Sequence, residues 1–227
     1  MTGATGNIYV GLHEFADMAF LLHFLRPSDI FLDVGANVGS YTVLASAVVG
    51  AKSVSIEPDP DTVCALKRNI DANEISEKVT VRAVAVGAEE GELSFTIGLD
   101  TMNRAAHAGD AAVRIVKQVR LDTLTADAPA LIKLDVEGHE EQVFRGASAT
   151  VTQPELKALL IETVTDEMLR ALDRAGFERA YYDPFTRALG SQPPSVAAIN
   201  SLFVRDKPFV AERLQKADPF HVLDQAV

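Results

Sequence analysis

The sequence predicts an α/β fold, a doubly wound Rossmann-like sheet with helices on both faces. Short runs of apolar and β-branched residues lie at 30–34, 53–57 and 79–86, and segments with helical spacing separate them. Three such strand–helix units in succession are typical of a parallel sheet with crossover helices. The run at 79–86 is almost continuously apolar or β-branched, as strands buried on both faces are. We therefore expect these runs to form a buried parallel core.

A largely apolar helix is expected before the first strand. Apolar side chains recur at helical spacing on two faces from Phe15 to Leu25, so this helix should be buried on two sides. Pro27 should end it before the strand begins. His13 and Glu14, at its start, either reach a ligand cleft or face solvent. We expect solvent exposure, because the helix dipole favours an acidic side chain in the first turn.

A glycine-containing turn follows the first strand directly. The strand ends in Asp33, and glycines follow at positions 35 and 39, where the backbone can bend sharply or approach a ligand. Free N–H groups at the next helix start suit an anionic or hydrogen-bonding ligand. Glu57 ends the second strand 24 positions after Asp33, where a carboxylate can accept hydrogen bonds from ribose hydroxyls. Together these features predict a nucleotide-type cofactor.

The spacing of the glycines argues against a dinucleotide. A dinucleotide turn needs three glycines, Gly-x-Gly-x-x-Gly, so that a pyrophosphate can lie against bare backbone. Here Asn37 fills the middle position, and Tyr41 or Thr42 fills the third. Asn37 would crowd a pyrophosphate, whereas its amide could reach the amino-acid end of S-adenosylmethionine. We therefore expect S-adenosylmethionine as cofactor, with an NAD-dependent oxidoreductase as the alternative.

The chain changes character after residue 87. Residues 92–97 and 113–121 alternate polar and apolar side chains, which predicts an inserted β-hairpin in place of a third crossover helix. Loops at the carboxyl edge of such sheets carry specificity. The connecting loop therefore offers candidate contacts to a methyl acceptor, although a solvated loop is an equal alternative. These candidates are Met102, Asn103, Arg104 and His107.

A second dense group of titratable residues follows the apolar strand expected at 131–134. Asp135, Glu137 and His139 fall within five residues at the carboxyl end of that strand. If the usual strand order holds, this end lies beside the first strand, where the switch in strand order places the ligand. We expect His139, whose ordinary pKa is about 6.5, or Asp135 to be the general base, and Glu137 to fix the acceptor. Asp135 could also orient the imidazole or hold the ammonium group of the donor.

No metal is expected at these three residues, because two carboxylates and one imidazole at a helix start are a thin ligand set. A binding module without catalysis is the alternative from another functional class. The acidic and imidazole groups at 135–139 count against it.

Further strands are expected at 156–162, 177–183 and 201–204. Thr165 should cap a helix that Gly176 ends. A loop at 184–200 contains Pro, Ser and Gly and is expected to fold over the cleft. Residues 205–227 are mixed and charged, which suggests a tail or a short helix.

Length and hydropathy limit the architecture. The 227 residues suit one domain, with an N-terminal helical segment at 1–28, a Rossmann-like core at 29–206 and a C-terminal tail at 207–227. No apolar run reaches about 18 residues, so no membrane span is expected. The N-terminus lacks a basic region followed by an apolar core, so we expect no secretory signal.

Charge and cysteine content point to a cytoplasmic enzyme acting on a small molecule. The balance of 21 basic and 32 acidic residues gives a net charge of −11 without a basic cluster, which disfavours nucleic acid as the main substrate. A small-molecule or carbohydrate acceptor suits this charge better. The single cysteine, Cys64, excludes an internal disulfide and fits a reducing compartment. We expect it to be a small buried apolar side chain.

Two motifs, taken together and in this order, resemble the FkbM family of S-adenosylmethionine-dependent methyltransferases. They are Asp-Val-Gly-Ala-Asn-Val-Gly-Ser-Tyr-Thr at 33–42 and Lys-Leu-Asp-Val-Glu-Gly-His-Glu at 133–140, and the resemblance runs from about residue 14 to residue 206. It implies a seven-stranded class I methyltransferase sheet with an antiparallel last strand. It also implies O-methylation of a hydroxyl on a sugar or another natural product.

The resemblance further implies that the glycine turn holds the methionine part of the cofactor and that Glu57 holds the ribose. Many methyltransferases place an acid after the third strand to bind adenine, but here that region is Ala83-Val84-Ala85. Adenine should then contact backbone groups there and Pro58 or Asp59. The expected cofactor contacts are Asp33, Gly35, Ala36, Asn37, Gly39, Tyr41, Thr42, Glu57, Pro58, Asp59, Ala85 and Asp135.

Overall fold

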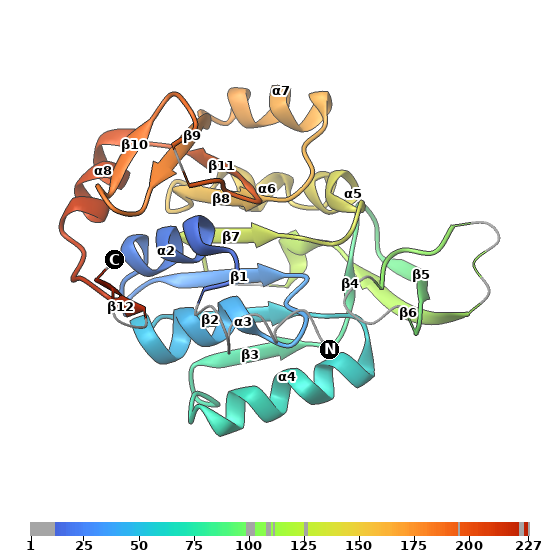
Figure 1. The fold of residues 1–227 in the computed structure, drawn as a ribbon. Helices are drawn as coiled ribbons and strands as arrows, with labels where there is room; N and C mark the ends of the chain where they lie inside the picture. The colour runs from blue at the N-terminus through green and yellow to red at the C-terminus, as the bar shows by residue number, and fades with distance from the viewer. Residues whose placement is uncertain are drawn as a thin grey trace.

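The computed structural model describes residues 12–98, 103–107, 110, 112–124, 127–194, 196–222 and 225–226. Among these residues, the main sheet has eight strands in the order β10-β9-β11-β8-β7-β1-β2-β3 (Figure 1). Their bounds are β1 (Ile30–Val34), β2 (Lys52–Ile56), β3 (Val79–Arg82), β7 (Leu131–Leu134), β8 (Ala158–Ile161), β9 (Glu178–Asp183), β10 (Ala188–Gly190) and β11 (Ser201–Val204).

The core of this sheet is parallel, as expected. β1 pairs in parallel with β2 on one side and with β7 on the other, and β7 pairs in parallel with β8. β11, the last strand of the sheet along the chain, runs antiparallel to both β8 and β9. The expected class I order with an antiparallel last strand is therefore present.

The number of strands differs from the expected seven, because part of the predicted 184–200 loop forms β10. The side chain of Asp183 accepts hydrogen bonds from the backbone N–H groups of Phe185 (2.9 Å) and Thr186 (3.4 Å). Arg187 then adopts a left-handed backbone conformation (φ 55°). This tight turn folds the chain back onto β9, where Leu189 pairs opposite Tyr182 and packs against the core.

Two layers of helices cover the sheet. On one face lie α2 (Phe15–Phe24), α3 (Ser40–Val43), the π-helix η1 (Leu44–Val49) and α8 (Lys207–Gln215); on the other lie α5 (Glu140–Arg145), α6 (Ser148–Thr152) and α7 (Asp166–Arg174). Adjacent strand residues alternate between the two cores, so that Phe31 packs in the first and Leu32 in the second. α2 is buried almost completely, which confirms the two-sided helix.

Helix α4 (Pro60–Ala72) lies at the β3 edge and packs through Leu66 and Ile70 against Val79 and Val81. Its N-terminus is capped by Asp59. Cys64 lies on the opposite side of this apolar stripe and is exposed, so the prediction of a buried cysteine is wrong.

The expected inserted hairpin is part of a separate three-stranded sheet. β5 (Gly91–Thr96) and β6 (Val113–Val119) pair antiparallel, and β4 (Ala85–Val86) joins β6 in parallel. The predicted strand at 79–86 is therefore divided between two sheets. β2 offers no partner beyond Arg82, so the chain leaves the main sheet there and pairs with β6 instead. Figure 1 shows this sheet projecting beyond the ends toward which β1 and β7 point.

The remaining elements are the short 3₁₀ helix η3 (Leu121–Thr123) and the strand pair β12 (His221–Val222) and β13 (Gln225–Ala226). Within the described part of the chain, no helix combines the length and apolar character that crossing a bilayer requires.

Candidate active site

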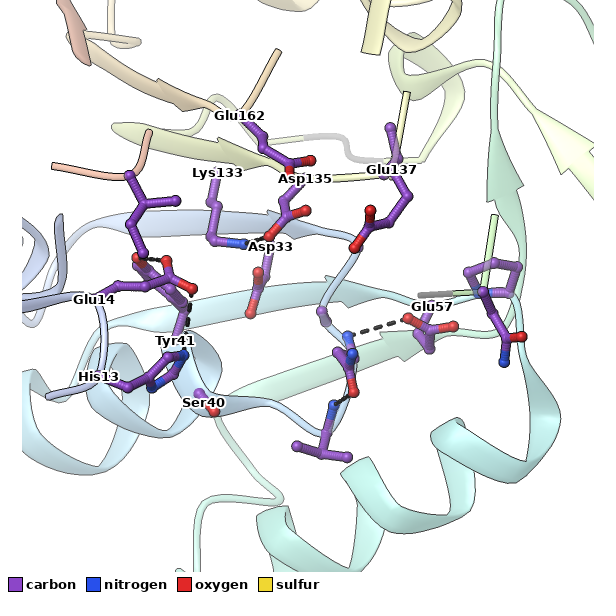
Figure 2. Close-up of a pocket in the computed structure, with 18 of the residues that line it drawn as sticks. His13, Glu14, Asp33, Ser40, Tyr41, Glu57, Lys133, Asp135, Glu137 and Glu162 are labelled. Carbon is purple, nitrogen blue, oxygen red and sulfur yellow. Dashed lines mark hydrogen bonds and ion pairs between the residues drawn. The ribbon is translucent and has the colours of Figure 1, made fainter. Parts of the chain in front are cut away.

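A cavity of about 300 Å³ opens at the carboxyl edge of the sheet, where the neighbouring strands β1 and β7 end. Figure 2 shows Glu57 and Glu14 toward opposite ends of this cavity, with Asp33, Lys133 and Asp135 between them. We call it the donor cavity. Nine of the predicted site residues line it, namely Asp33, Gly35, Ala36, Asn37, Tyr41, Glu57, Pro58, Asp135 and Glu137.

Gly35 lets the end of β1 pack directly against the end of β7. Its backbone is left-handed (φ 83°), and a Cβ atom at this position would lie 1.7 Å from the carbonyl oxygen of Asp135. No side chain fits in that space. Its N–H donates to the carbonyl of Ile56 at 3.0 Å, which also ties the turn to β2.

Glu57 joins the tips of the first and second strands. Its Oε2 accepts from the backbone N–H of Asn37 (3.1 Å) and its Oε1 from that of Asp59 (2.9 Å). Burial raises the pKa of Glu57 to about 7, against the effect of these two donors. Asn37 adopts φ 49°, and its side-chain oxygen accepts from the N–H of Val38 at 2.8 Å. The turn is thus held in shape by its own polar groups.

Asp33 is buried behind the turn. The Thr42 hydroxyl lies 2.7 Å from Asp33 Oδ2, to which it donates, and 2.7 Å from the Ser55 hydroxyl. Burial raises the pKa of Asp33, although the charge of Lys133 opposes the shift. Thr42 and Gly39, both predicted cofactor contacts, do not line the cavity, and Thr42 supports Asp33 from behind.

Lys133 was not identified from the sequence as a site residue. Its Nζ lies 2.6 Å from Asp135 Oδ2 and 4.7 Å from the centre of the Tyr41 ring, and the side chain is buried. Burial by itself would lower its pKa, but Asp135, Asp33 and Glu14 outweigh burial and raise it. Lys133 therefore stays protonated and forms an ion pair with Asp135. Strand alternation places residues 133 and 135 on one side of β7, and a lysine within an apolar strand was the available signal.

Glu14 and His13 line the cavity, so the expectation that both face solvent is wrong. Glu14 Oε2 accepts from the Tyr41 hydroxyl (2.5 Å) and from the Asn200 side chain (3.2 Å), and Oε1 lies 3.3 Å from His13 Nε2. Burial would raise the pKa of Glu14, but hydrogen bonds from His13 and Tyr41 together with the charge of Lys133 lower it to about 2. Glu14 is therefore a fixed negative charge in the wall.

Glu162, at the end of β8, is the second residue that sequence reasoning missed. It lines the cavity, and its carboxylate lies with those of Asp135 and Glu137 in a cluster whose oxygens are within 4.8 Å of one another. Its Oε2 is buried without a hydrogen-bond partner among the described residues. Burial and the neighbouring charge of Asp135 raise the pKa of Glu162 to about 8. Like Glu57, it directly follows a buried strand, and that signal was available.

His139 is not brought together with Asp135 and Glu137. It lines a separate, smaller cavity of about 30 Å³ with Pro58, Ala85 and other apolar residues. Burial lowers the pKa of His139, which favours a neutral imidazole. Glu137 and Gly138 both adopt left-handed conformations (φ 53° and 89°), and this turn carries His139 to the start of α5. The predicted trio is therefore corrected: Glu162 takes the place of His139 in the cluster.

Asp59 also lies outside both cavities. It caps α4, and it binds Arg114 (3.0 Å) and the Asn103 side chain (3.3 Å) of the inserted region. Of the candidate acceptor contacts in that region, Asn103 lines the donor cavity, whereas Arg104 pairs with Asp110. His107 lines neither of these cavities, and Met102 lies outside the described residues.

Comparison with known proteins places this site in a family. The model of the Methyltransferase FkbM domain matches residues 33–179. A curated relative, the hexuronic acid methyltransferase AglP of Haloferax volcanii, is 28% identical over 130 residues, which cover 56% of this chain and 53% of AglP.

Among solved structures, methyltransferase FkbM from Methylobacillus flagellatus KT is 18% identical with a TM-score of 0.52, over 82% of this chain and 47% of that one. An rRNA methylase from Streptococcus thermophilus is 12% identical with a TM-score of 0.46, over 82% and 91% of the two chains. The chain spans about half the length of AglP and of the Methylobacillus protein.

The segment matched by the family model begins at the glycine turn, contains the Asp135–His139 motif and extends into β9. It covers more than half of the chain, which decides against the oxidoreductase alternative. The protein therefore belongs to the FkbM methyltransferase family and has the expected class I fold.

Proposed function

We propose that this protein transfers the methyl group of S-adenosylmethionine to a hydroxyl of a carbohydrate or a related small molecule. The charge of the donor cavity carries this proposal. Six carboxyl groups line the cavity, whereas its basic residues are Lys133 and His13; the carboxyl groups are those of Glu14, Asp33, Glu57, Asp135, Glu137 and Glu162. Such a wall attracts the sulfonium and ammonium groups of the donor and repels the pyrophosphate of a dinucleotide.

The residues of the cavity fit the parts of the donor in order. Asp33 and the turn from Gly35 to Asn37 would hold the methionine end, and Glu57 would accept hydrogen bonds from the ribose. Pro58 lines both this cavity and the smaller apolar cavity that contains Ala85 and His139. We place the adenine at that junction, which gives His139 a role in binding rather than in proton transfer.

The donor supplies a methyl carbon bonded to a positively charged sulfur. Transfer to oxygen is an in-line displacement, so the site must position the acceptor hydroxyl and accept its proton. Glu162, with Asp135 beside it, is suited to this task, because burial and the charge of Asp135 raise the pKa of Glu162 to about 8. Glu137, which is partly exposed at the cavity, remains the candidate for fixing the acceptor.

A carbohydrate acceptor is supported by the relative AglP, which is named for its action on hexuronic acid. The net charge of −11 also suits a small acceptor better than nucleic acid. That nucleic acid is not the substrate stays a prediction. The division of the chain into a helical segment at 1–28, a core at 29–206 and a tail at 207–227 also stays a prediction.

The test has two stages. Calorimetric titration of the protein with S-adenosylmethionine and with NAD should show binding of the first only. Mass spectrometry across a panel of sugars and other hydroxylated natural products should then detect a product heavier by one methylene unit. Binding of NAD without S-adenosylmethionine would reject the proposal. Methylation on nitrogen or carbon alone would reject the O-methylation part.

A further inference from the structure

A second cavity lies beside the donor cavity and has a different character. Its volume is about 330 Å³, and it is bounded by α2, β9, β11 and residues 193–194 and 196–200. We call it the side cavity. Its lining combines apolar groups such as Phe20 and Pro194 with the polar groups of Tyr181, Asn200 and Ser201. Mixed walls of this kind are typical of pockets for small organic ligands.

The two cavities share a wall. Ile199 lines both of them. The side chain of Asp17 holds this wall, because its Oδ2 accepts from the backbone N–H groups of Ile199 and Asn200, each at 3.0 Å. The Asn200 amide also donates to Glu14, which lines the donor cavity. A ligand in the side cavity would therefore lie next to the donor.

The order of strand ends places Asp135 and Glu162 between the donor-binding turn and the side cavity. Along the carboxyl edge the sheet runs from β2, which ends before Glu57, through β1 and β7 to β8, which ends before Glu162. β11 follows, and its first residue, Ser201, pairs with Ile161. The donor-binding turn and the side cavity thus lie on opposite sides of Asp135 and Glu162, as a donor and an acceptor must around a shared proton acceptor.

The charge of the side cavity is balanced, whereas the lining of the donor cavity has an excess of carboxyl groups. Its lining includes one basic residue, Arg179, and one carboxylate, Asp17. Asp17 is buried and committed to the hydrogen bonds of the wall. Arg179 is exposed, donates to the Ser201 hydroxyl at 3.1 Å and lies 5.7 Å from the Tyr181 ring. Within the described ranges no carboxylate lies at ion-pair distance from Arg179, and its neighbour Glu178 pairs with Lys207 at 3.6 Å.

From this arrangement we infer that the side cavity binds the methyl acceptor and that Arg179 recognises a carboxylate on it. An anionic sugar cannot place its carboxylate among the six carboxyl groups of the donor cavity, but it can do so beside the Arg179 guanidinium, which has no ion-pair partner among the described residues. The acceptor class is therefore a uronic acid or another hydroxylated carboxylate. This inference rests on the proposed methyl transfer and adds the acceptor site to it.

The experiment compares two acceptors that differ only at one carbon. p-Nitrophenyl β-D-glucuronide carries a carboxylate where p-nitrophenyl β-D-glucoside carries a hydroxymethyl group. We expect kcat/KM for the glucuronide to exceed that for the glucoside by about 10- to 100-fold, the range of one charge-assisted contact. Arg179→Gln should remove this preference by lowering kcat/KM for the glucuronide to the value for the glucoside. Arg179→Lys should retain part of it.

The matched control is Arg170→Gln, an exposed arginine on α7 that lines neither cavity. In Arg170→Gln the ratio of kcat/KM for the glucuronide to that for the glucoside should equal the ratio in the wild type. Binding of both glycosides is also measured by calorimetry in the presence of S-adenosylhomocysteine, which separates recognition from turnover. Equal use of the two glycosides by the wild type, binding of neither, or a preference that survives in Arg179→Gln would overturn the inference. Failure of S-adenosylmethionine itself to bind would instead reject the proposed function.

Discussion

Single carboxyl groups determine how this site handles a proton. Asp135 forms an ion pair with Lys133 at 2.6 Å, whereas burial and the charge of Asp135 raise the pKa of the adjacent Glu162 to about 8. Two similar side chains at the ends of neighbouring strands therefore have different partners, and Glu162 has a raised pKa. One can hold a positively charged donor while the other exchanges a proton.

Glu162→Gln tests this division. We expect turnover to fall by about 10²- to 10⁴-fold, the usual contribution of a general base, with the Kd for S-adenosylmethionine changed only slightly. In the wild type, turnover should rise with pH up to about 8, because the base acts in its ionised form. The variant should lose that rise. Glu141→Gln, on α5 and outside the donor cavity, is the control. Wild-type turnover in Glu162→Gln would show that another group acts as the general base.

Metal removal tests the same cluster. Three carboxylates within 4.8 Å offer oxygen ligands, but Asp135 is already paired with Lys133 and Glu162 holds a proton near neutral pH. We therefore expect turnover to be unchanged after dialysis against EDTA and after addition of Mg²⁺ or Mn²⁺. Loss of activity with EDTA that Mg²⁺ restores would show that a cation takes part.

Gly35→Ala should be severe. A methyl group there meets the Asp135 carbonyl in a left-handed backbone position, so we expect a loss of about 3 kcal/mol or more in the free energy of unfolding and loss of donor binding. Urea denaturation and calorimetry measure the two effects. Gly91→Ala is the control, because a Cβ there meets nothing within 4 Å. Equal stability of the two variants would contradict the packing described.

At the level of elements, the start of α2 and the segment leading into β11 form one wall. The carboxylate of Asp17 accepts two backbone N–H groups and the Asn200 amide, at 3.0, 3.0 and 3.1 Å. Burial raises the pKa of Asp17, although these donors favour its ionised form. The wall between the cavities thus depends on a contact between residues far apart in the sequence.

Asp17→Ala should loosen that wall. The buried donors lose their acceptor, so we expect a loss of about 2–4 kcal/mol in the free energy of unfolding and a higher KM for the acceptor. Asp17→Asn keeps one acceptor oxygen, so its free energy of unfolding and its acceptor KM should lie between those of the wild type and of Asp17→Ala. Asp173→Ala, an exposed aspartate on α7, should behave as the wild type in urea denaturation and kinetics. An unchanged acceptor KM in Asp17→Ala would show that the wall does not position the acceptor.

At the scale of the whole molecule, the carboxyl groups of the site oppose folding at neutral pH. Burial raises the pKa of Glu57 from 4.5 to about 7, and the pKa of Asp33 is raised as well. Between about pH 4.5 and pH 7 the folded protein binds more protons than the unfolded chain. The free energy of unfolding therefore falls as the pH rises through this range. Glu14, with its pKa lowered to about 2, acts in the opposite sense and only below about pH 4.5.

We therefore expect the free energy of unfolding of the ligand-free protein to be higher at pH 5 than at pH 8. Glu57 contributes about 2–3 kcal/mol of this difference. Urea titrations at several pH values measure it. S-Adenosylmethionine should reduce the difference by binding the ionised site, and Glu57→Gln should flatten the curve. Stability that rises from pH 5 to pH 8 in the absence of ligand would contradict the burial of these groups.

The parallel core, the glycine turn and the strand ends that carry Asp33, Glu57 and Asp135 could be predicted from the amino-acid sequence alone. These features are local: alternation, β-branching and strand-ending acids are visible within a few residues. The same reasoning failed where the place of a strand depends on its pairing partner. Residues 79–86 were expected to form one strand but are divided between two sheets, and residues 188–190 were expected to be loop but form an edge strand after a turn.

Which side chains share a cavity depends on how distant parts of the chain pack together. The left-handed turn at Glu137 and Gly138 carries His139 away from Asp135, although the two are four positions apart. Glu162 and Glu14 reach the same cavity from other parts of the chain, because parallel pairing aligns strand ends and α2 covers them. Direction of a side chain depends on backbone rotation, and proximity across strands depends on register; neither is fixed by distance along the sequence.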